Sequence, residues 1–198
     1  MVSPGVKVAL VPGVLALLPA YAGRVDPVAE LRAAAQAAVQ WLGPDVQVVA
    51  DAQGMRVAEA LGVSSGLYDA RRRGSWLLDQ RSGGFETVVS ATSSTSVGGT
   101  NVLVVANGSA RRSEKAPGHL DERAQGFDAD VEKALRCGDV EALRGIDRAL
   151  ARELMVCNID GLADLGKVLP PGLTAEVDYA DDPFGVQYWV MRWSADRP

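Results

Sequence analysis

The sequence predicts an α/β protein, a single three-layer α/β/α domain over residues 1–198 with a central, mostly parallel, mixed sheet. The chain has 198 residues, of which 47% are hydrophobic and 23% charged, which suits one domain with a full core. Near the N-terminus an apolar strand, a helix and a second apolar strand follow one another, an order that favours a parallel sheet. A later apolar strand, residues 102–105, runs into the polar turn Asn107-Gly108-Ser109. Parallel-sheet proteins place ligands at such strand ends.

The first elements follow from apolar runs and their breakers. Residues 6–11 are apolar and stop at Pro12-Gly13, which predicts a buried strand. Asp26 as N-cap and Pro27 in the first turn predict a helix that ends at Gly43-Pro44. Its inward face at helical spacing comprises Val28, Leu31, Ala35, Val39 and Leu42. Residues 46–50 predict the second strand.

Residues 8–22 also fit a secretory signal peptide, because Lys7 precedes them and they end in Ala-Tyr-Ala. Only one lysine precedes the apolar run, and Pro12, Gly13 and Pro19 interrupt it. A strand followed by a tight loop explains the same residues, and we favour that interpretation.

The remaining elements are assigned in the same way. Helices are predicted at residues 55–61, 67–81, 127–136, 140–143, 146–155 and 162–169, and strands at 85–90, 101–106, 173–179 and 186–193. The run Arg71-Arg72-Arg73 in the second of these helices is either a solvated face or an anion site. The polar loop 91–100 is either a lid or a connector.

Composition limits the partners. The net charge of −5 argues against nucleic acid, since phosphate neutralisation needs a basic face. No apolar run reaches the length of a membrane-spanning helix, so no membrane partner is expected. The two cysteines, Cys137 and Cys157, do not make a disulfide framework and fit a reducing cytoplasm.

One series of motifs resembles a known family. Ser109-Ala110-Arg111, Ala116-Pro117-Gly118, Arg123, Gly126-Phe127-Asp128, Gly138-Asp139 and Ile146-Asp147 follow one another as in the class III extradiol ring-cleaving dioxygenases of the LigB type and their Memo-like relatives. The resemblance covers most of the chain. It is strong between Gly108 and Asp147 and weaker before Asn101. It is nearest to small actinobacterial proteins that carry the Gly-Ser-Ala-Arg-Arg pattern.

This resemblance implies a non-haem Fe(II) site with two histidines and one glutamate, and a further histidine as acid/base. The positions expected for these ligands hold Gly13, Asp51 or Ala52, Ala110 and Val156 instead. The whole chain has a single histidine, His119, so two histidine ligands from one chain are impossible. No metal ligand, cofactor or catalytic residue is therefore assigned.

His119 is interpreted as a surface loop residue, although a weak metal site with Asp121 or Glu122 is an alternative. Nothing in the spacing supports a catalytic triad of Ser109, His119 and an aspartate. The pair Gly98-Gly99 lacks the Lys-Ser/Thr of a phosphate loop.

A binding pocket can remain even where the metal-binding side chains have been replaced. The loops after the first, second and fourth strands are expected to converge at one edge of the sheet, so the candidate ligand-binding residues are Gly13, Asn107, Ser109, Ala110, Arg111 and Arg112. The two arginines can clamp a small anionic ligand, a carboxylate or phosphate. The structural alternative is that one pairs with Glu114 or Asp128 and the other faces water. Residues 181–185 are either a rim of this pocket or a plain turn.

The four tryptophans, Trp41, Trp76, Trp189 and Trp193, are expected to anchor the core or an interface. Two of them fall on the last strand, whose edge can pair with a second copy in a homodimer. The sequence thus favours a non-catalytic, dioxygenase-like protein that binds a small anionic ligand or a protein partner. The alternative is a metal-independent hydrolase or transferase that uses Ser109 or Asp51 in the same pocket.

Overall fold

A computed structural model describes residues 6–21, 26–63, 88–90 and 101–195. Its strands are β1 (Val6–Val11), β2 (Val46–Ala50), β3 (Val88–Ser90), β4 (Asn101–Val105), β5 (Glu176–Asp181) and β6 (Tyr188–Ala195). Its helices are α1 (Ala29–Leu42), α2 (Ala52–Ala60), α3 (Arg123–Cys137), α4 (Val140–Arg144), α5 (Arg148–Glu153) and α6 (Ile159–Val168), with short 3₁₀ turns η1 (Leu15–Leu17) and η2 (Pro19–Tyr21).

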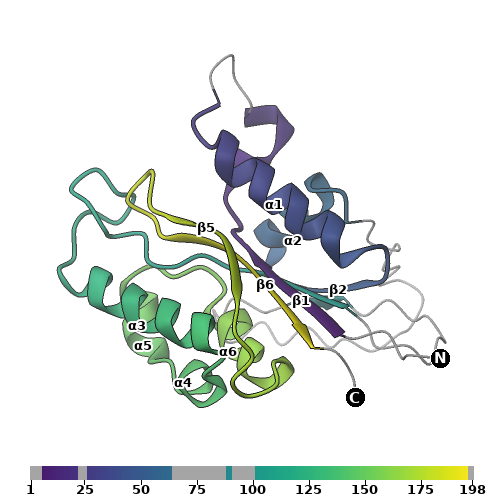
Figure 1. The fold of residues 1–198 in the computed structure, drawn as a ribbon. Helices are drawn as coiled ribbons and strands as arrows, with labels where there is room; N and C mark the ends of the chain where they lie inside the picture. The colour runs from purple at the N-terminus through teal and green to yellow at the C-terminus, as the bar shows by residue number, and fades with distance from the viewer. Residues whose placement is uncertain (1–5, 22–25, 64–87, 91–100, 196–198) are drawn as a thin grey trace, which may run out of the picture.

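The described strands form one mixed sheet in the order β3-β2-β4-β1-β6-β5 (Figure 1). The centre is parallel: β4 lies between β1 and β2, with Leu10 opposite Val104 and Val48 opposite Leu103. Strand β3 is antiparallel to β2, and β6 is antiparallel to both β1 and β5. Four of these six strands, β1, β2, β4 and β5, therefore point the same way.

Helices cover both faces of the sheet, which gives the predicted three layers (Figure 1). On one face, α1 and α2 pack on alternate residues of the strands, such as Ala9 and Val11 of β1. On the other, α3 to α6 pack on Val8 and Leu10 of the same strand. Because successive strand residues point to opposite faces, a strand buried on both sides must be apolar throughout, as the centre of β1 is.

Several predictions are confirmed. Strands β1 and β2 have the predicted bounds, and β1 lies in the middle of the sheet. All five residues of the inward face predicted for the first helix are buried. Trp189 and Trp193 are core residues, and Trp41 is partly buried against the core.

None of the helices in the described ranges combines the length and apolar character that a bilayer span requires.

Other predictions were wrong in detail. Asp26 does not cap the first helix, which begins at Ala29. Its carboxylate instead accepts from the Val28 backbone N–H at 3.1 Å and pairs with Arg32. The last strand is not an edge strand, because β6 hydrogen-bonds to β1 on one side and to β5 on the other. An unpaired edge on that strand therefore cannot recruit a second copy.

Some predictions fall outside the described residues. These are the helix at 67–81 with its arginine run and Trp76, the loop at 91–100, and the first three residues of the strand predicted at 85–90.

Candidate functional site

The carboxyl ends of β1, β2 and β4, the neighbouring parallel strands, meet as the sequence predicts. The Asn107 side chain, just after β4, accepts a hydrogen bond from the backbone N–H of Gly13, which follows β1; the distance is 2.8 Å. From the start of α2, the Gln53 amide donates to the Gly13 carbonyl at 2.6 Å. Three segments that are distant in sequence are thus joined by two side-chain amides.

The segment after α5 closes the same edge. The Asn158 amide donates to the Val105 carbonyl at 2.8 Å, and the Cys157 thiol donates to Asp51 Oδ2 at 3.3 Å. Burial, together with the neighbouring Asp51 carboxylate, raises the pKa of Cys157 to about 12. The thiol therefore stays protonated at neutral pH and serves as a hydrogen-bond donor.

Small residues fill the space between these strand ends. A Cβ placed on Gly54 would lie 3.0 Å from the side chains of both Ala50 and Val105. A Cβ on Gly13 would lie 3.3 Å from the Val105 side chain. A side chain at Gly54 requires Ala50 and Val105 to move, and one at Gly13 makes a tight contact with Val105. Little room is therefore left beside Val105 at the position where the resemblance places the first metal ligand.

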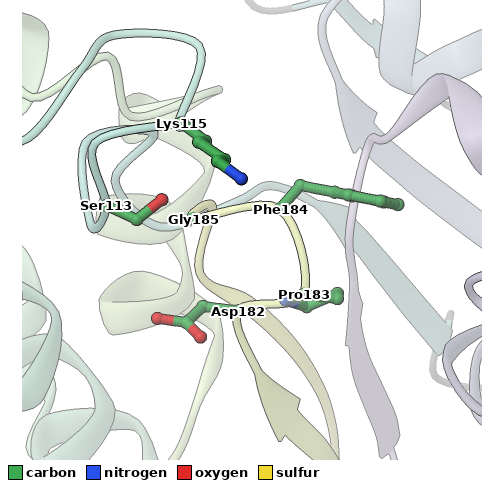
Figure 2. A pocket seen from close by; sticks show the side chains of 6 residues that line it. All are labelled: Ser113, Lys115, Asp182, Pro183, Phe184 and Gly185. Atoms are coloured by element: carbon green, nitrogen blue, oxygen red, sulfur yellow. The ribbon is translucent and has the colours of Figure 1, made fainter.

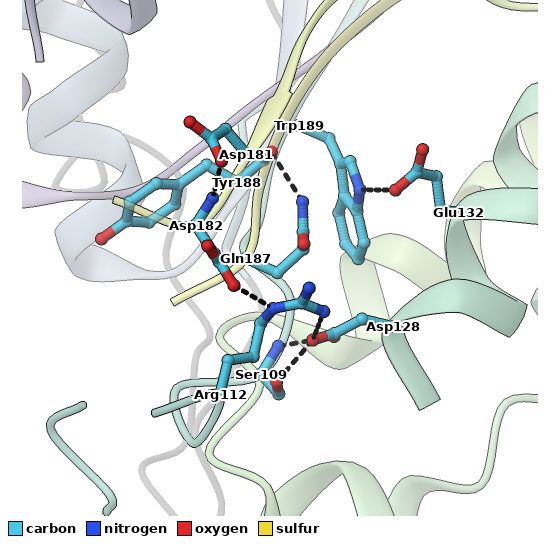
Figure 3. A network of polar contacts seen from close by, with 9 residues as sticks. All are labelled: Ser109, Arg112, Asp128, Glu132, Asp181, Asp182, Gln187, Tyr188 and Trp189. Atoms are coloured by element: carbon cyan, nitrogen blue, oxygen red, sulfur yellow. Dashed lines mark hydrogen bonds and ion pairs between the residues drawn. The ribbon is translucent and has the colours of Figure 1, made fainter. Parts of the chain in front are cut away.

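Next to this edge lies a buried polar network (Figure 3). Asp128, on α3, accepts from the Ser109 backbone N–H at 2.8 Å and from the Ser109 hydroxyl at 2.5 Å. Arg112 Nη1 lies 3.2 Å from Asp128 Oδ2, and Arg112 Nε lies 2.5 Å from Asp182 Oδ2. Burial raises the pKa of Asp128, while the bonds from Ser109 and Arg112 oppose that rise. The pairing of one arginine with Asp128, which is the first part of the structural alternative, is thus confirmed.

Gln187, which precedes β6, and Trp189 within β6 contact this network and the turn after β4. Gly108 N–H donates to the Gln187 carbonyl at 2.8 Å, and Gln187 N–H donates to the Ser109 carbonyl at 2.9 Å. A Cβ on Gly108 would lie 2.7 Å from Gln187 Cβ and 2.8 Å from the Trp189 ring. The Trp189 indole N–H in turn donates to Glu132 of α3 at 3.1 Å. The turn after β4 therefore requires glycine at position 108.

Arg111 behaves differently from Arg112. It is half-buried, and its Nε is a buried donor without an acceptor among the described residues. Its aliphatic part lies against Gly118, where a Cβ would be 2.6 Å from Arg111 Cγ. The sulfur of the exposed Met155 is 2.7 Å from the same Cβ position, so Arg111 and Met155 both lie close to Gly118.

A shallow hollow of about 460 Å³ lies beside the network. It is lined by Ser113, Lys115 and residues 182–185 of the β5–β6 connection (Figure 2). Figure 2 shows the Lys115 side chain extending toward this connection, with the Phe184 ring pointing away from it. Residues 182–185 thus line this hollow and not a pocket of the candidate residues, and Asp182 also pairs with Arg112.

None of the six candidate ligand-binding residues lines this hollow. Gly13, Asn107, Ser109 and Ala110 are buried, and Gly13 and Asn107 are joined by their hydrogen bond. Arg111 and Arg112 are half-buried. The sequence analysis missed Gln53 and Asn158, which tie the strand ends together, and Gln187, which braces the turn. Asn158 carries a detectable signal, since its side chain caps α6 by accepting from Gly161 N–H at 3.2 Å. Gln53 and Gln187 have no such signal, because their partners are set by tertiary packing.

The side chains at this edge do not suit the Fe(II) site implied by the resemblance. Gly13, Ala110 and Val156 offer no donor atom, and both carboxylate oxygens of Asp51 are already hydrogen-bonded, to Gly54 N–H and to Cys157. His119 is 70% exposed in its side chain and faces Glu114 at 3.2 Å, as predicted for a surface loop. Within the described ranges, no three His, Cys, Asp or Glu side chains are grouped as a metal site.

Comparison with known proteins adds no relative. No protein-family model matches the sequence, and no curated protein matches it significantly. The dioxygenase relationship is therefore a proposal that rests on the residues quoted above.

Proposed function

We propose that this chain is a non-catalytic, extradiol-dioxygenase-like protein that works by binding rather than by turnover. The observation that carries the proposal is the closure of the sheet edge. The polar groups that converge there, Asn107, Ser109 and Asp51, are bonded to other parts of the same chain. A ring-cleaving enzyme needs open metal positions at this place for its substrate and for O2.

The small number of possible metal-binding side chains supports the proposal independently of the packing. With one histidine in the sequence, a single chain cannot supply two imidazole ligands to a metal. That histidine lies in an exposed loop and is engaged with Glu114. We also propose a cytoplasmic location, in keeping with the two free thiols, Cys137 and Cys157.

The geometry around Ser109 does not favour the alternative of a metal-independent hydrolase or transferase. The Ser109 side chain is fully buried, and its hydroxyl proton is donated to Asp128. A nucleophile needs a base that takes its proton and an open path to the substrate. Here the carboxylate that receives the hydroxyl is itself held by Arg112, so the arrangement is that of a structural support.

Oxygen consumption tests the proposal. The purified protein, loaded with Fe(II) under anaerobic conditions, is mixed with a panel of catechols in air-saturated buffer, and the same Fe(II) solution without protein serves as the control. We expect oxygen uptake equal to that of the control and no ring-opened product. Catalytic formation of a ring-opened acid above the control would refute the proposal. Turnover that disappears in a Ser109→Ala variant would instead support the alternative enzyme.

A further inference from the structure

Arg111 differs from the other semi-buried arginines of the described part of the chain. Each of the others, Arg32, Arg112, Arg148 and Arg192, is paired with at least one carboxylate. Arg111 has no carboxylate within ion-pair distance and no hydrogen-bond acceptor for its side chain among the residues that the structure describes. Asp121 is near enough for the Arg111 charge to help Arg123 lower the pKa of that carboxyl, but it does not bond to the Arg111 guanidinium. A partly buried cation without a bonded partner is uncommon, because burial removes solvation that only a partner can replace.

The neighbouring carboxylate of Asp121 is not free to fill this role. Asp121 lies beside Arg111, since its backbone N–H donates to the Arg111 carbonyl at 2.9 Å. Both of its carboxylate oxygens, however, bind Arg123, at 3.0 Å and 2.8 Å. Arg123 also holds Glu153 at 2.8 Å. The carboxylates of Asp121 and Glu153 are thus both paired with Arg123.

The backbone at Gly118 lies directly against the Arg111 side chain. Gly118 N–H donates to the Ala110 carbonyl at 3.0 Å, which brings residue 118 alongside Arg111. A Cβ at position 118 would lie 2.6 Å from Arg111 Cγ and 2.9 Å from Nε. Only glycine leaves room for the arginine there. Of the three guanidinium nitrogens, Nε alone is a buried unpaired atom, so the two Nη groups reach the surface.

We propose that Arg111 forms an oxyanion subsite that takes one carboxylate or phosphate group of a small molecule. The two exposed Nη groups bind a pair of oxygens in the end-on, two-bond arrangement that guanidinium favours. The close approach of Gly118 restricts the aliphatic part of Arg111, so little side-chain freedom is lost when the anion binds. This inference rests on the proposed binding function and names the ligand chemistry for it.

Nuclear magnetic resonance of the Arg111 Nε–Hε group provides a direct test. Inorganic phosphate and acetate are titrated separately at constant ionic strength, with chloride as the compensating salt. We expect a saturable shift of this signal and of the Gly118 amide in at least one arm, and the arm that saturates at lower concentration identifies the preferred oxyanion. Equal, non-saturating changes with phosphate, acetate and chloride would overturn the proposal.

Two variants and a matched control distinguish specific anion binding at Arg111 from non-specific attraction by positive charge. Arg111→Lys keeps the charge and loses the paired donors, so binding followed at the Gly118 amide should weaken at least about tenfold. Gly118→Ala should also weaken anion binding, because the added Cβ displaces the Arg111 side chain. If Gly118→Ala misfolds, the Arg111→Lys variant alone tests the proposal. Arg152→Ala, at an exposed arginine of α5, should bind as the parent does. Unchanged affinity in Arg111→Lys would refute the subsite.

The two proposals fail in different ways. Iron-dependent ring cleavage would overturn the non-catalytic function and leave the anion titration interpretable. Absence of saturable anion binding would remove the Arg111 subsite alone, because it has no bearing on turnover.

Discussion

The Ser109 hydroxyl donates to Asp128 Oδ2 at 2.5 Å, and both residues are buried. This bond joins the turn after β4 to the middle of α3. The same carboxylate also receives the Ser109 backbone N–H and lies 3.2 Å from Arg112 Nη1. The serine that sequence analysis marked as a possible nucleophile is thus a structural donor to a shared carboxylate.

Replacing this carboxylate should be costly. Asp128→Asn leaves one acceptor oxygen for two Ser109 donors and removes the charge that Arg112 faces. We expect a loss of about 2–4 kcal/mol in the free energy of unfolding, measured by urea denaturation. Asp130→Asn, at an exposed position of the same helix, is the matched control and should change stability by less than about 0.5 kcal/mol. Similar losses in both variants would show that the network does not stabilise the fold.

Two glycines should respond to alanine in opposite directions. A Cβ on Gly108 would lie within 2.8 Å of Gln187, Asp128 and the Trp189 ring, so Gly108→Ala should destabilise the protein by about 1–3 kcal/mol. Gly126, in α3, would have nothing within 4 Å of an added Cβ, and alanine there should stabilise the helix by about 0.5–1 kcal/mol. Thermal unfolding of the two variants checks this difference. A stable Gly108→Ala variant would contradict the packing described for the turn.

The two cysteines should differ strongly in reactivity. Cys137 is exposed, whereas the pKa of Cys157 is raised to about 12 by burial and by Asp51. Because the thiolate is the reactive form, iodoacetamide at about pH 8 should alkylate Cys137 and spare Cys157 until the protein is unfolded. Peptide mass mapping of native and urea-treated samples distinguishes the two. Equal labelling of both thiols in the native protein would mean that the contact with Asp51 does not form.

Much of the fold could be predicted from local pattern. The bounds of β1 and β2 and the inward face of α1 follow from apolar periodicity. Helix starts were less accurate, since α2 and α6 begin three residues before their predicted starts, where Asp51 and Asn158 cap them. Strand order could not be predicted, because β6 lies between β1 and β5 through pairings with distant segments.

The candidate site was predicted to a similar extent. The spacing of strands and turns placed Gly13 and Asn107 together, and a hydrogen bond joins them. The pairing of Arg112 with Asp182 could not be foreseen, since 70 positions separate the two residues and the β5–β6 connection brings them together. Nor could sequence alone predict that Arg112 is paired with carboxylates and Arg111 is not, because the partners of adjacent residues are set by tertiary packing.

The central claim is that the sheet edge cannot hold the iron of a ring-cleaving dioxygenase, and anaerobic Fe(II) loading tests it most directly. The protein is equilibrated with Fe(II), free metal is removed by gel filtration, and the bound iron is measured by elemental analysis alongside a His119→Ala variant. We predict iron far below one atom per chain and no difference between the two proteins. One tightly held Fe(II) per chain of the parent protein would contradict the claim.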